Sequence, residues 1–144
     1  MNKILFIFFF GFIACLSQNI SAQSTDEIAV RTLLEKQENA WNQGNIEAFM
    51  DGYWKSDSLM FVGKSGITYG WQKTLDNYKK HYPDVAAMGK LHFDILEMKA
   101  ILPGHFFIIG KWQLTRSMGN IGGYFSLLFK KINRQWLIVC DHTS

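Results

Sequence analysis

The residues best suited to proton transfer are a histidine and an aspartate two positions apart. His92 and Asp94 fall in a segment of alternating polar and apolar residues, so they share one face of a predicted strand. A carboxylate beside an imidazole can tune its basicity, which makes the two a candidate catalytic acid–base pair. Leu91 and Phe93 alternate with them and resemble the core side of the strand, so a solvated strand face is the competing interpretation.

A second candidate lies at the end of the chain. Adjacent strand residues point to opposite faces, so Asp141 and His142 cannot form a side-by-side dyad. His142 shares a face with Trp136 and Cys140, which predicts that its ring reaches the domain interior. There it would either make a structural hydrogen bond or act as a catalytic imidazole in a pocket.

Structural roles are expected for the two residues that precede His142. Asp141 is predicted to form an ion pair across strands with Arg116 or Lys111. Cys140 lies two positions from His142, a spacing that holds strand side chains too far apart for a direct hydrogen bond, and a free cysteine is usually buried and inert. Thiol catalysis is therefore not expected.

The four histidines lack the spacing of a metal site. His81 is predicted on a helix surface and His105 in a turn, while His92 and His142 fall on different strands. The chain also contains no phosphate-binding loop and no nucleophile elbow. The sequence thus predicts neither a bound metal nor a cofactor.

Helices are predicted in the first half of the domain. Ser24 and Glu27 form a capping box, and apolar residues at helical spacing follow until Gly44. Asn45 caps a short second helix, and a third helix is predicted over 70–82, where a proline follows.

Strands make up the remainder. A hairpin is predicted from residues 59–62 and 67–69. After Gly89 the apolar period becomes two, and it slips near Ile95, which predicts a β-bulge there. The later strands are expected at 106–116, 124–131 and 136–142, and their short connections imply a mostly antiparallel sheet.

This order of elements carries a family resemblance, and four segments strengthen it. They are 40–45 (AWNQGN), 49–62, 110–112 (GKW) and the ending 136–144 (WLIVCDHTS). The chain resembles the nuclear-transport-factor-2-like superfamily, also called ketosteroid-isomerase-like or SnoaL-like, and within it an exported bacterial branch of unknown function. The resemblance implies an α+β cone, in which three N-terminal helices pack on a curved, mostly antiparallel sheet and enclose a pocket. It also implies a homodimer through the outer sheet face.

Steroid isomerase chemistry does not carry over with the resemblance. The family's general-base aspartate corresponds to Val62, and its oxyanion tyrosine to Gln37. Its protonated aspartate lies on a late strand, yet residues 124–130 contain no acid. All three catalytic groups are missing.

A cone of this kind would place aromatic side chains, which make up 15% of the chain, around its pocket. Tyrosine and tryptophan join an apolar body to a polar tip, which suits a partly apolar ligand. These residues could equally fill the core. The predicted ligand-binding residues are Trp54, Tyr69, Trp71, Tyr78, Trp112 and Arg116.

The first residues resemble a signal peptide, so the domains are predicted as 1–22 (signal) and 23–144 (folded). Lys3 precedes a run of about 13 apolar residues, too short to span a bilayer, which takes roughly 20. Cleavage after Ala22 would leave Cys140 as the sole cysteine and so exclude an internal disulfide. The alternative is a lipoprotein acylated on Cys15. Either way the protein is expected to be exported, periplasmic or secreted, with no membrane span.

Three functions remain open from these observations. The first is an exported binding domain for a small, partly apolar molecule. The second is an isomerase, dehydratase or hydrolase in which His92, Asp94 and His142 transfer protons. The third is a dimerisation or partner-recruiting module whose outer sheet face carries Phe107, Ile109 and Phe125. The net charge of +3 is scattered along the chain, so nucleic acid is not an expected partner.

Overall fold

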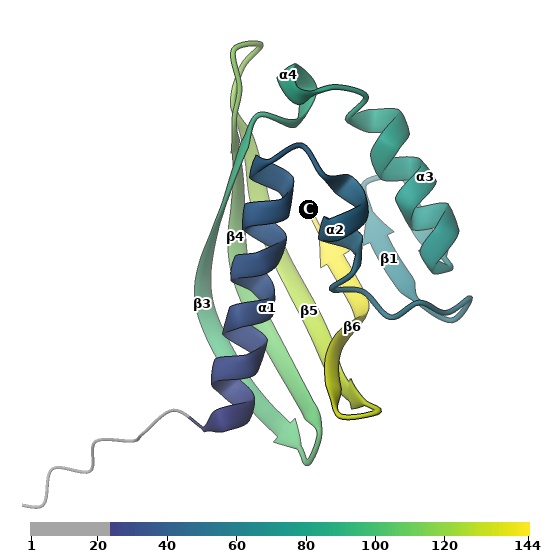
Figure 1. Ribbon diagram of the computed structural model, residues 1–144, viewed down its shortest axis with the longest axis vertical. Coiled ribbons are helices and arrows are strands. Elements are labelled where there is room, and N and C mark those ends of the chain that lie inside the picture. Colours follow the sequence, from purple (N-terminus) through teal and green to yellow (C-terminus); the bar gives the residue numbers. More distant parts are fainter. Residues whose placement is uncertain (1–23) are drawn as a thin grey trace, which may run out of the picture.

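The computed structural model describes residues 24–144, and the predicted signal peptide lies outside them. The fold is a layer of helices packed on one curved sheet (Figure 1). The helices are α1 (Thr25–Asn42), α2 (Ile46–Met50), α3 (Trp71–His81) and α4 (Val85–Met88). The strands are β1 (Met60–Gly63), β2 (Gly66–Tyr69), β3 (Lys90–Leu102), β4 (His105–Thr115), β5 (Ile121–Ile132) and β6 (Gln135–Thr143). The predicted order is confirmed, with the short helix α4 in addition.

The helix starts follow from the capping residues that the sequence offers. The Ser24 hydroxyl accepts a hydrogen bond from the Glu27 backbone N–H at 3.1 Å, and the Asn45 side chain accepts one from Ala48 at 3.0 Å. Along α1 one face is buried, so this helix lies with its apolar stripe against the sheet. None of the helices in the described part of the chain is long and apolar enough to cross a membrane.

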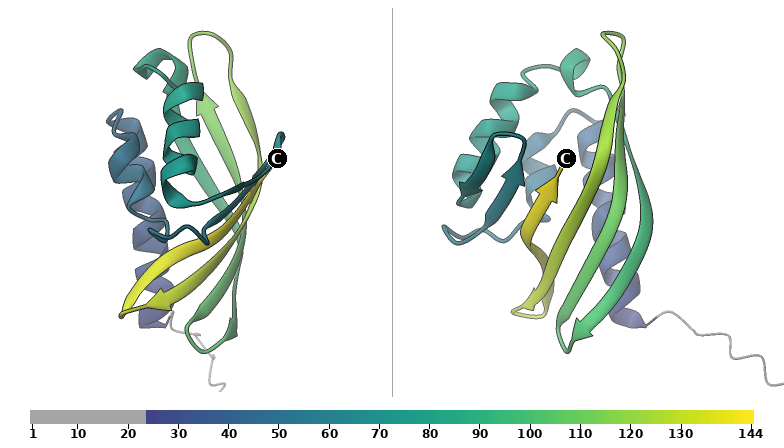
Figure 2. Two further views of the ribbon diagram at one scale, coloured as in Figure 1. Left: turned by 90° about the vertical axis from the view of Figure 1, so that its right-hand side faces the viewer. Right: turned by 180° about the vertical axis from the view of Figure 1, so that it is seen from behind.

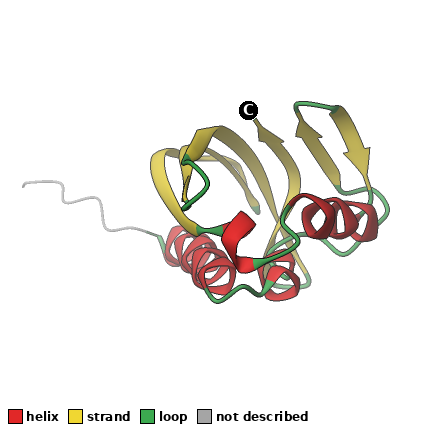
Figure 3. Cartoon of the chain, turned by 90° about the horizontal axis from the view of Figure 1, so that it is seen from above, coloured by secondary structure: helices red, strands yellow, loops and turns green. Residues whose placement is uncertain are grey.

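The six strands form one sheet in the order β2-β1-β6-β5-β4-β3. The pairing of β1 with β6 is parallel and the other four are antiparallel. Figure 2 shows that β3, β4 and β5 are long, and Figure 3 shows that the sheet curves around the helices. The register of β3 shifts between Ile95 and Glu97, which confirms the predicted bulge and supplies part of this bend.

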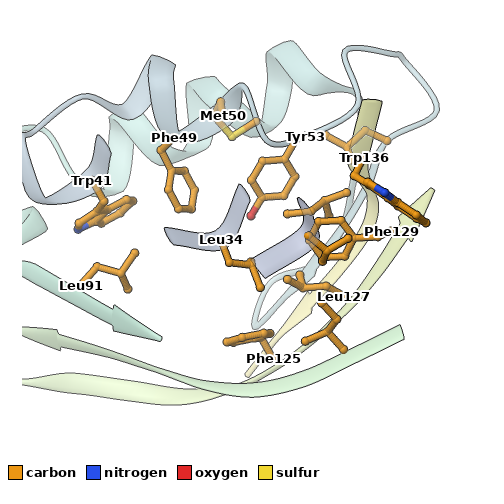
Figure 4. Packing of buried hydrophobic residues seen from close by; sticks show 14 of the residues in the cluster. Leu34, Trp41, Phe49, Met50, Tyr53, Leu91, Phe125, Leu127, Phe129 and Trp136 are labelled. Carbon is orange, nitrogen blue, oxygen red and sulfur yellow. The ribbon is translucent and has the colours of Figure 1, made fainter. Parts of the chain in front are cut away.

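The core fills the space between the helices and the inner, helix-facing side of the sheet. Figure 4 shows Trp41, Phe49 and Tyr53 on the helical side, opposite Phe125 and Leu127 of β5. All elements and the buried cluster of the described chain lie between Thr25 and Thr143. The helices and strands of residues 24–144 thus share one buried core, which is the basis on which a domain folds.

Candidate functional site

A buried carboxyl group, Asp141 of β6, is the most distinctive polar feature of the interior. Its side chain is only 3% exposed. The Tyr53 hydroxyl donates to its Oδ2 at 2.7 Å, and the Thr143 hydroxyl donates to its Oδ1 at 2.6 Å. Each carboxyl oxygen thus has one donor, which leaves each with capacity for a further hydrogen bond.

A bulge in β6 turns Asp141 inward. The register between β5 and β6 shifts so that Ile138 pairs with Phe129 and Cys140 with Leu128, and Val139 is left over. Beyond this extra residue the inward positions become Asp141 and Thr143 instead of Cys140 and His142. The predicted orientation of His142 is therefore wrong, because its side chain is exposed. The predicted ion pair of Asp141 is also wrong, because hydrogen bonds with Tyr53 and Thr143 take its place.

Tyr53 is held in place by the backbone that follows α2. It forms an isolated parallel bridge with Ile138 of β6. The Ile138 N–H donates to the Gly52 carbonyl, and the Ile138 carbonyl accepts from Trp54 N–H, both at 2.9 Å. A Cβ at Gly52 would lie 2.7 Å from the buried Gln37 side chain, so a larger residue there would force Gln37 to shift. These contacts aim the Tyr53 ring at the carboxyl group of β6.

Burial sets the protonation behaviour of this cluster. It raises the pKa of Asp141 from 3.8 to about 6, although hydrogen bonds from Thr143 and Tyr53 and the nearby His142 act in the opposite direction. Burial also raises the pKa of Tyr53 and of Tyr78 well above the usual value of tyrosine, and the nearby charge of Asp141 is the second cause. The two tyrosines therefore stay neutral hydrogen-bond donors, and Asp141 can change protonation close to neutral pH.

An aromatic cluster surrounds these hydroxyl groups. Phe49 lies 5.8 Å from Tyr53 and 5.4 Å from Tyr78, measured between ring centroids. Tyr78 also lies 5.7 Å from Phe61 and 6.2 Å from Tyr82. These edge, tilted and stacked contacts fill the space with apolar ring surface, while the tyrosine hydroxyls supply polar groups within it. Phe61, Tyr78 and Tyr82 are only half-buried, so they form the outer wall of the cluster, next to α3 and β1.

Most of the predicted ligand-binding residues lie outside this cluster. Only Tyr78 of the six belongs to it. Tyr69 is 57% exposed, and Trp71 donates its indole N–H to the Met50 carbonyl at 2.9 Å. Arg116 hydrogen-bonds the Gly119 and Ala87 carbonyls and so braces a turn.

The remaining predicted residues fall in separate places. Trp54 is half-buried in the loop before β1. Trp112 is half-buried on β4, and its indole N–H is buried without a hydrogen-bond partner among the described residues.

His92 and Asp94 do share a face of β3, as predicted, but it is the outer one. Both are exposed and line an open cleft of about 500 Å³ with residues of β4 and β5. The His92 Nδ1 lies 3.5 Å from a Glu38 carboxylate oxygen. His142 lies on β6, which β4 and β5 separate from β3, and it does not line this cleft. The three predicted catalytic residues therefore do not converge.

Phe125 lies in the core and not on the outer sheet face, so its predicted position is wrong. The sequence places it on the outer face with Phe107 and Ile109, but it is 5% exposed. It pairs with Gly110 across β4 and β5, and a Cβ at 110 would lie 2.3 Å from its ring. Phe107 and Ile109 are on the outer face, 36% and 37% exposed.

The side chains that could hold a metal ion are dispersed over the described part of the chain. Among residues 24–144, no three His, Cys, Asp or Glu side chains are grouped closely enough to hold a metal ion. The buried Asp141 is surrounded by hydroxyl groups and aromatic rings, a setting suited to hydrogen bonding and proton exchange rather than to cation binding.

Comparisons with known proteins agree with this architecture. No family model matches the chain, and no curated protein matches it. Among solved structures, an NTF-2 like protein of unknown function from Shewanella oneidensis MR-1 is 39% identical, with a TM-score of 0.80. The alignment covers 83% of this chain and 98% of that one. The chain therefore belongs to the NTF2-like family.

More distant structures share the fold alone. An NTF2-like protein of unknown function from Pseudomonas putida KT2440 is 13% identical with a TM-score of 0.66, over 85% of this chain and 89% of that one. A ketosteroid isomerase-like protein from Erwinia carotovora atroseptica SCRI1043 is 13% identical with a TM-score of 0.63, over 84% and 98%. Neither identity is high enough to transfer an activity.

Proposed function

We propose that this domain binds a small, partly apolar molecule inside the cone, with a polar group of the ligand held by the Asp141–Tyr53 pair. The observation that carries the proposal is a carboxyl group 3% exposed, with two hydroxyl donors, set in a wall of aromatic rings. Apolar sites with a few convergent polar groups are the usual form of small-molecule pockets. A ligand hydroxyl or carbonyl would use the remaining hydrogen-bonding capacity of this cluster.

Access to the cluster would be between α3 and β1, where Phe61 and Tyr78 are half-buried. On this side α3 is tied to β2 by a hydrogen bond from the Asn77 side-chain amide to the Thr68 hydroxyl at 3.2 Å. Rotation of the two half-buried rings would open a route to Tyr53, at the expense of the edge contacts that Tyr78 makes with Phe49 and Trp41. The ligand would then replace aromatic contacts that now close the space.

Native mass spectrometry and a thermal-shift screen of flat, partly apolar alcohols, ketones and phenols test this function. Binding is expected to raise the melting temperature of the wild-type domain and to be lost in the Tyr53→Phe variant, because a hydroxyl of the anchor is removed. The matched control is Tyr69→Phe, since Tyr69 is 57% exposed and lies on β2, which β1 separates from β6. Stabilisation that survives Tyr53→Phe, or the absence of any ligand, would contradict the proposal.

Proton transfer is the second candidate, and the pKa of Asp141 favours it. A carboxyl group with a pKa of about 6 can donate and accept a proton near neutral pH, as a general acid or base requires. In this version the bound ligand is an isomerase or dehydratase substrate, and Asp141 replaces His92, Asp94 and His142 as the catalytic group. Turnover that follows a pH profile near 6 and disappears in Asp141→Asn would establish it.

Export and dimerisation complete the proposed function. The chain is proposed to be processed after Ala22, or acylated at Cys15, which mass measurement of the amino terminus distinguishes. Two copies are proposed to pair through the outer sheet face, where Phe107 and Ile109 are more than a third exposed. Ile109→Asp is expected to convert a dimer to a monomer in sedimentation analysis, and an unchanged dimer would argue against this face.

A further inference from the structure

One end of the molecule gathers two hairpin turns and the start of α1, and it is called the basal end here. It consists of the β3–β4 turn, the β5–β6 turn and the first turn of α1, at the bottom of Figure 1. The Lys131 backbone N–H donates to the Gly104 carbonyl at 2.8 Å, which joins β5 to the β3–β4 turn. The Asp26 carboxylate accepts from Lys131 Nζ at 2.5 Å and from Trp136 Nε1 at 3.1 Å, which adds α1 and β6. The end is therefore a braced surface rather than a set of loose loops.

Two neighbouring apolar side chains project from this end. Ile101 is 48% exposed and Leu102 is 53% exposed. The register shifts between Ala100 and Leu102, which leaves Ile101 without a partner on β4. Pro103 follows and is also exposed. Apolar residues at the tip of a rigid hairpin contribute little to the core, which makes their exposure informative.

Basic side chains flank the apolar tip. Lys99, Lys130 and Arg134 are exposed, and Lys131 is paired with Asp26. Lys130 lies opposite His105 in the β4–β5 pairing, directly beside the turn. An apolar tip surrounded by cations complements an anionic lipid surface, in which the apolar residues enter the interface and the cations meet headgroups.

The chain enters the described domain at this same end. The apolar run 4–16 is separated from Ser24 by residues 17–23. These seven residues reach at most about 25 Å when fully extended. If the chain is acylated at Cys15 and the lipid stays in a bilayer, the basal end is the part of the domain nearest to it.

We propose that the basal end docks on anionic lipid bilayers, with Ile101 and Leu102 at the interface and Lys99, Lys130 and Arg134 against the headgroups. The aromatic cluster and the outer face of the sheet stay free in this orientation. Docking would therefore hold the proposed ligand site beside the membrane, without using any residue of that site.

Vesicle flotation of residues 24–144 tests the proposal without the amino-terminal apolar run. The domain is expected to bind phosphatidylcholine vesicles with a quarter phosphatidylglycerol, and to bind less in high salt or with phosphatidylcholine alone. Leu102→Asp should weaken vesicle binding at least about tenfold. The double variant Lys130→Glu, Arg134→Glu should weaken it by about fivefold or more for each cation removed. The controls are Met118→Asp, which is 66% exposed in the β4–β5 turn, and Lys64→Glu with Lys73→Glu.

A second measurement uses the full chain in the same vesicles. Hydrogen exchange is expected to slow in segments 101–104 and 132–135 relative to the β4–β5 turn at the opposite end of the sheet. The proposal would be overturned if exchange in segments 101–104 and 132–135 is unaltered by vesicles. It would also be overturned if Leu102→Asp and Met118→Asp reduce vesicle binding equally. Loss of self-association in Leu102→Asp without any vesicle binding would overturn it too, by assigning the patch to a second copy.

Discussion

Replacing Asp141 by asparagine tests the consequence of burying a carboxyl group. The pKa of Asp141 is about 6 in the folded protein and 3.8 in an unfolded chain. The native state therefore binds more protons than the unfolded state between these values, so the free energy of unfolding falls as the pH rises through this window. The total loss is about 3 kcal/mol, a large share of the stability of a domain of this size.

The loss is spread unevenly over the accessible pH range. About 1.4 kcal/mol of it falls between pH 5 and pH 7.5, from the same two pKa values. Asparagine cannot ionise, so Asp141→Asn should remove this dependence of the unfolding free energy on pH. The asparagine NH2 group cannot accept a hydrogen bond, so one of the two hydroxyl groups must rotate to accept from it, at a cost of about 1 kcal/mol at every pH. The quantity to compare is the difference in unfolding free energy between wild type and variant as a function of pH.

Urea unfolding of both proteins, followed by tryptophan fluorescence at several pH values, measures this difference. Acidic groups such as Asp26 and Glu47, whose pKa is lowered by hydrogen bonds from Lys131 and Lys79, contribute stability that is lost on acidification, but equally in both proteins. Asp94→Asn is the matched control, because its carboxyl group is exposed. A wild-type minus variant difference that does not change with pH would refute the argument that burial dominates at Asp141.

Three further substitutions probe the surroundings, each measured by chemical or thermal unfolding. Tyr53→Phe removes the donor to Asp141 and should lower the free energy of unfolding by about 1–3 kcal/mol. The loss of stability between pH 5 and 7.5 should also become steeper, because the pKa of Asp141 rises further without this hydrogen bond. An unchanged stability would show that the hydrogen bond is not needed. Gly110→Ala places a methyl group against the Phe125 ring and should destabilise by about 1–3 kcal/mol, whereas a neutral effect would mean that the β4–β5 contact is looser than described. His142→Ala should change stability by less than about 0.5 kcal/mol because the ring is exposed, and a large loss would restore the predicted interior position.

The sequence was sufficient for the architecture because each element carries its own local signal. The capping residues at Ser24 and Asn45 and the slip in alternation near Ile95 all mark structure that is present. In β3 the slip is visible because polar and apolar residues alternate clearly on both sides of it. The order of helices and strands then followed from the lengths of the connections.

The candidate site was not predictable because β6 lacks the clear polar–apolar alternation that reveals the bulge in β3. In β6 three successive residues, 138–140, are apolar or nearly so, and they hide the position of the extra residue. Strict alternation then puts His142 inside and Asp141 outside, the opposite of what forms. Phe125 was misplaced because its face depends on pairing with Gly110, and cross-strand register is not encoded in either strand alone.

Titration calorimetry of the strongest ligand from the screen tests whether Asp141 and Tyr53 anchor a ligand in the aromatic cluster. The wild-type domain, Asp141→Asn and Asp94→Asn are compared at one pH above 7. Binding to Asp141→Asn is expected to be at least about tenfold weaker, equivalent to about 1.4 kcal/mol, and binding to Asp94→Asn is expected to be unchanged. Equal affinity for wild type and Asp141→Asn, with weaker binding to Asp94→Asn, would contradict it and move the site to the outer cleft.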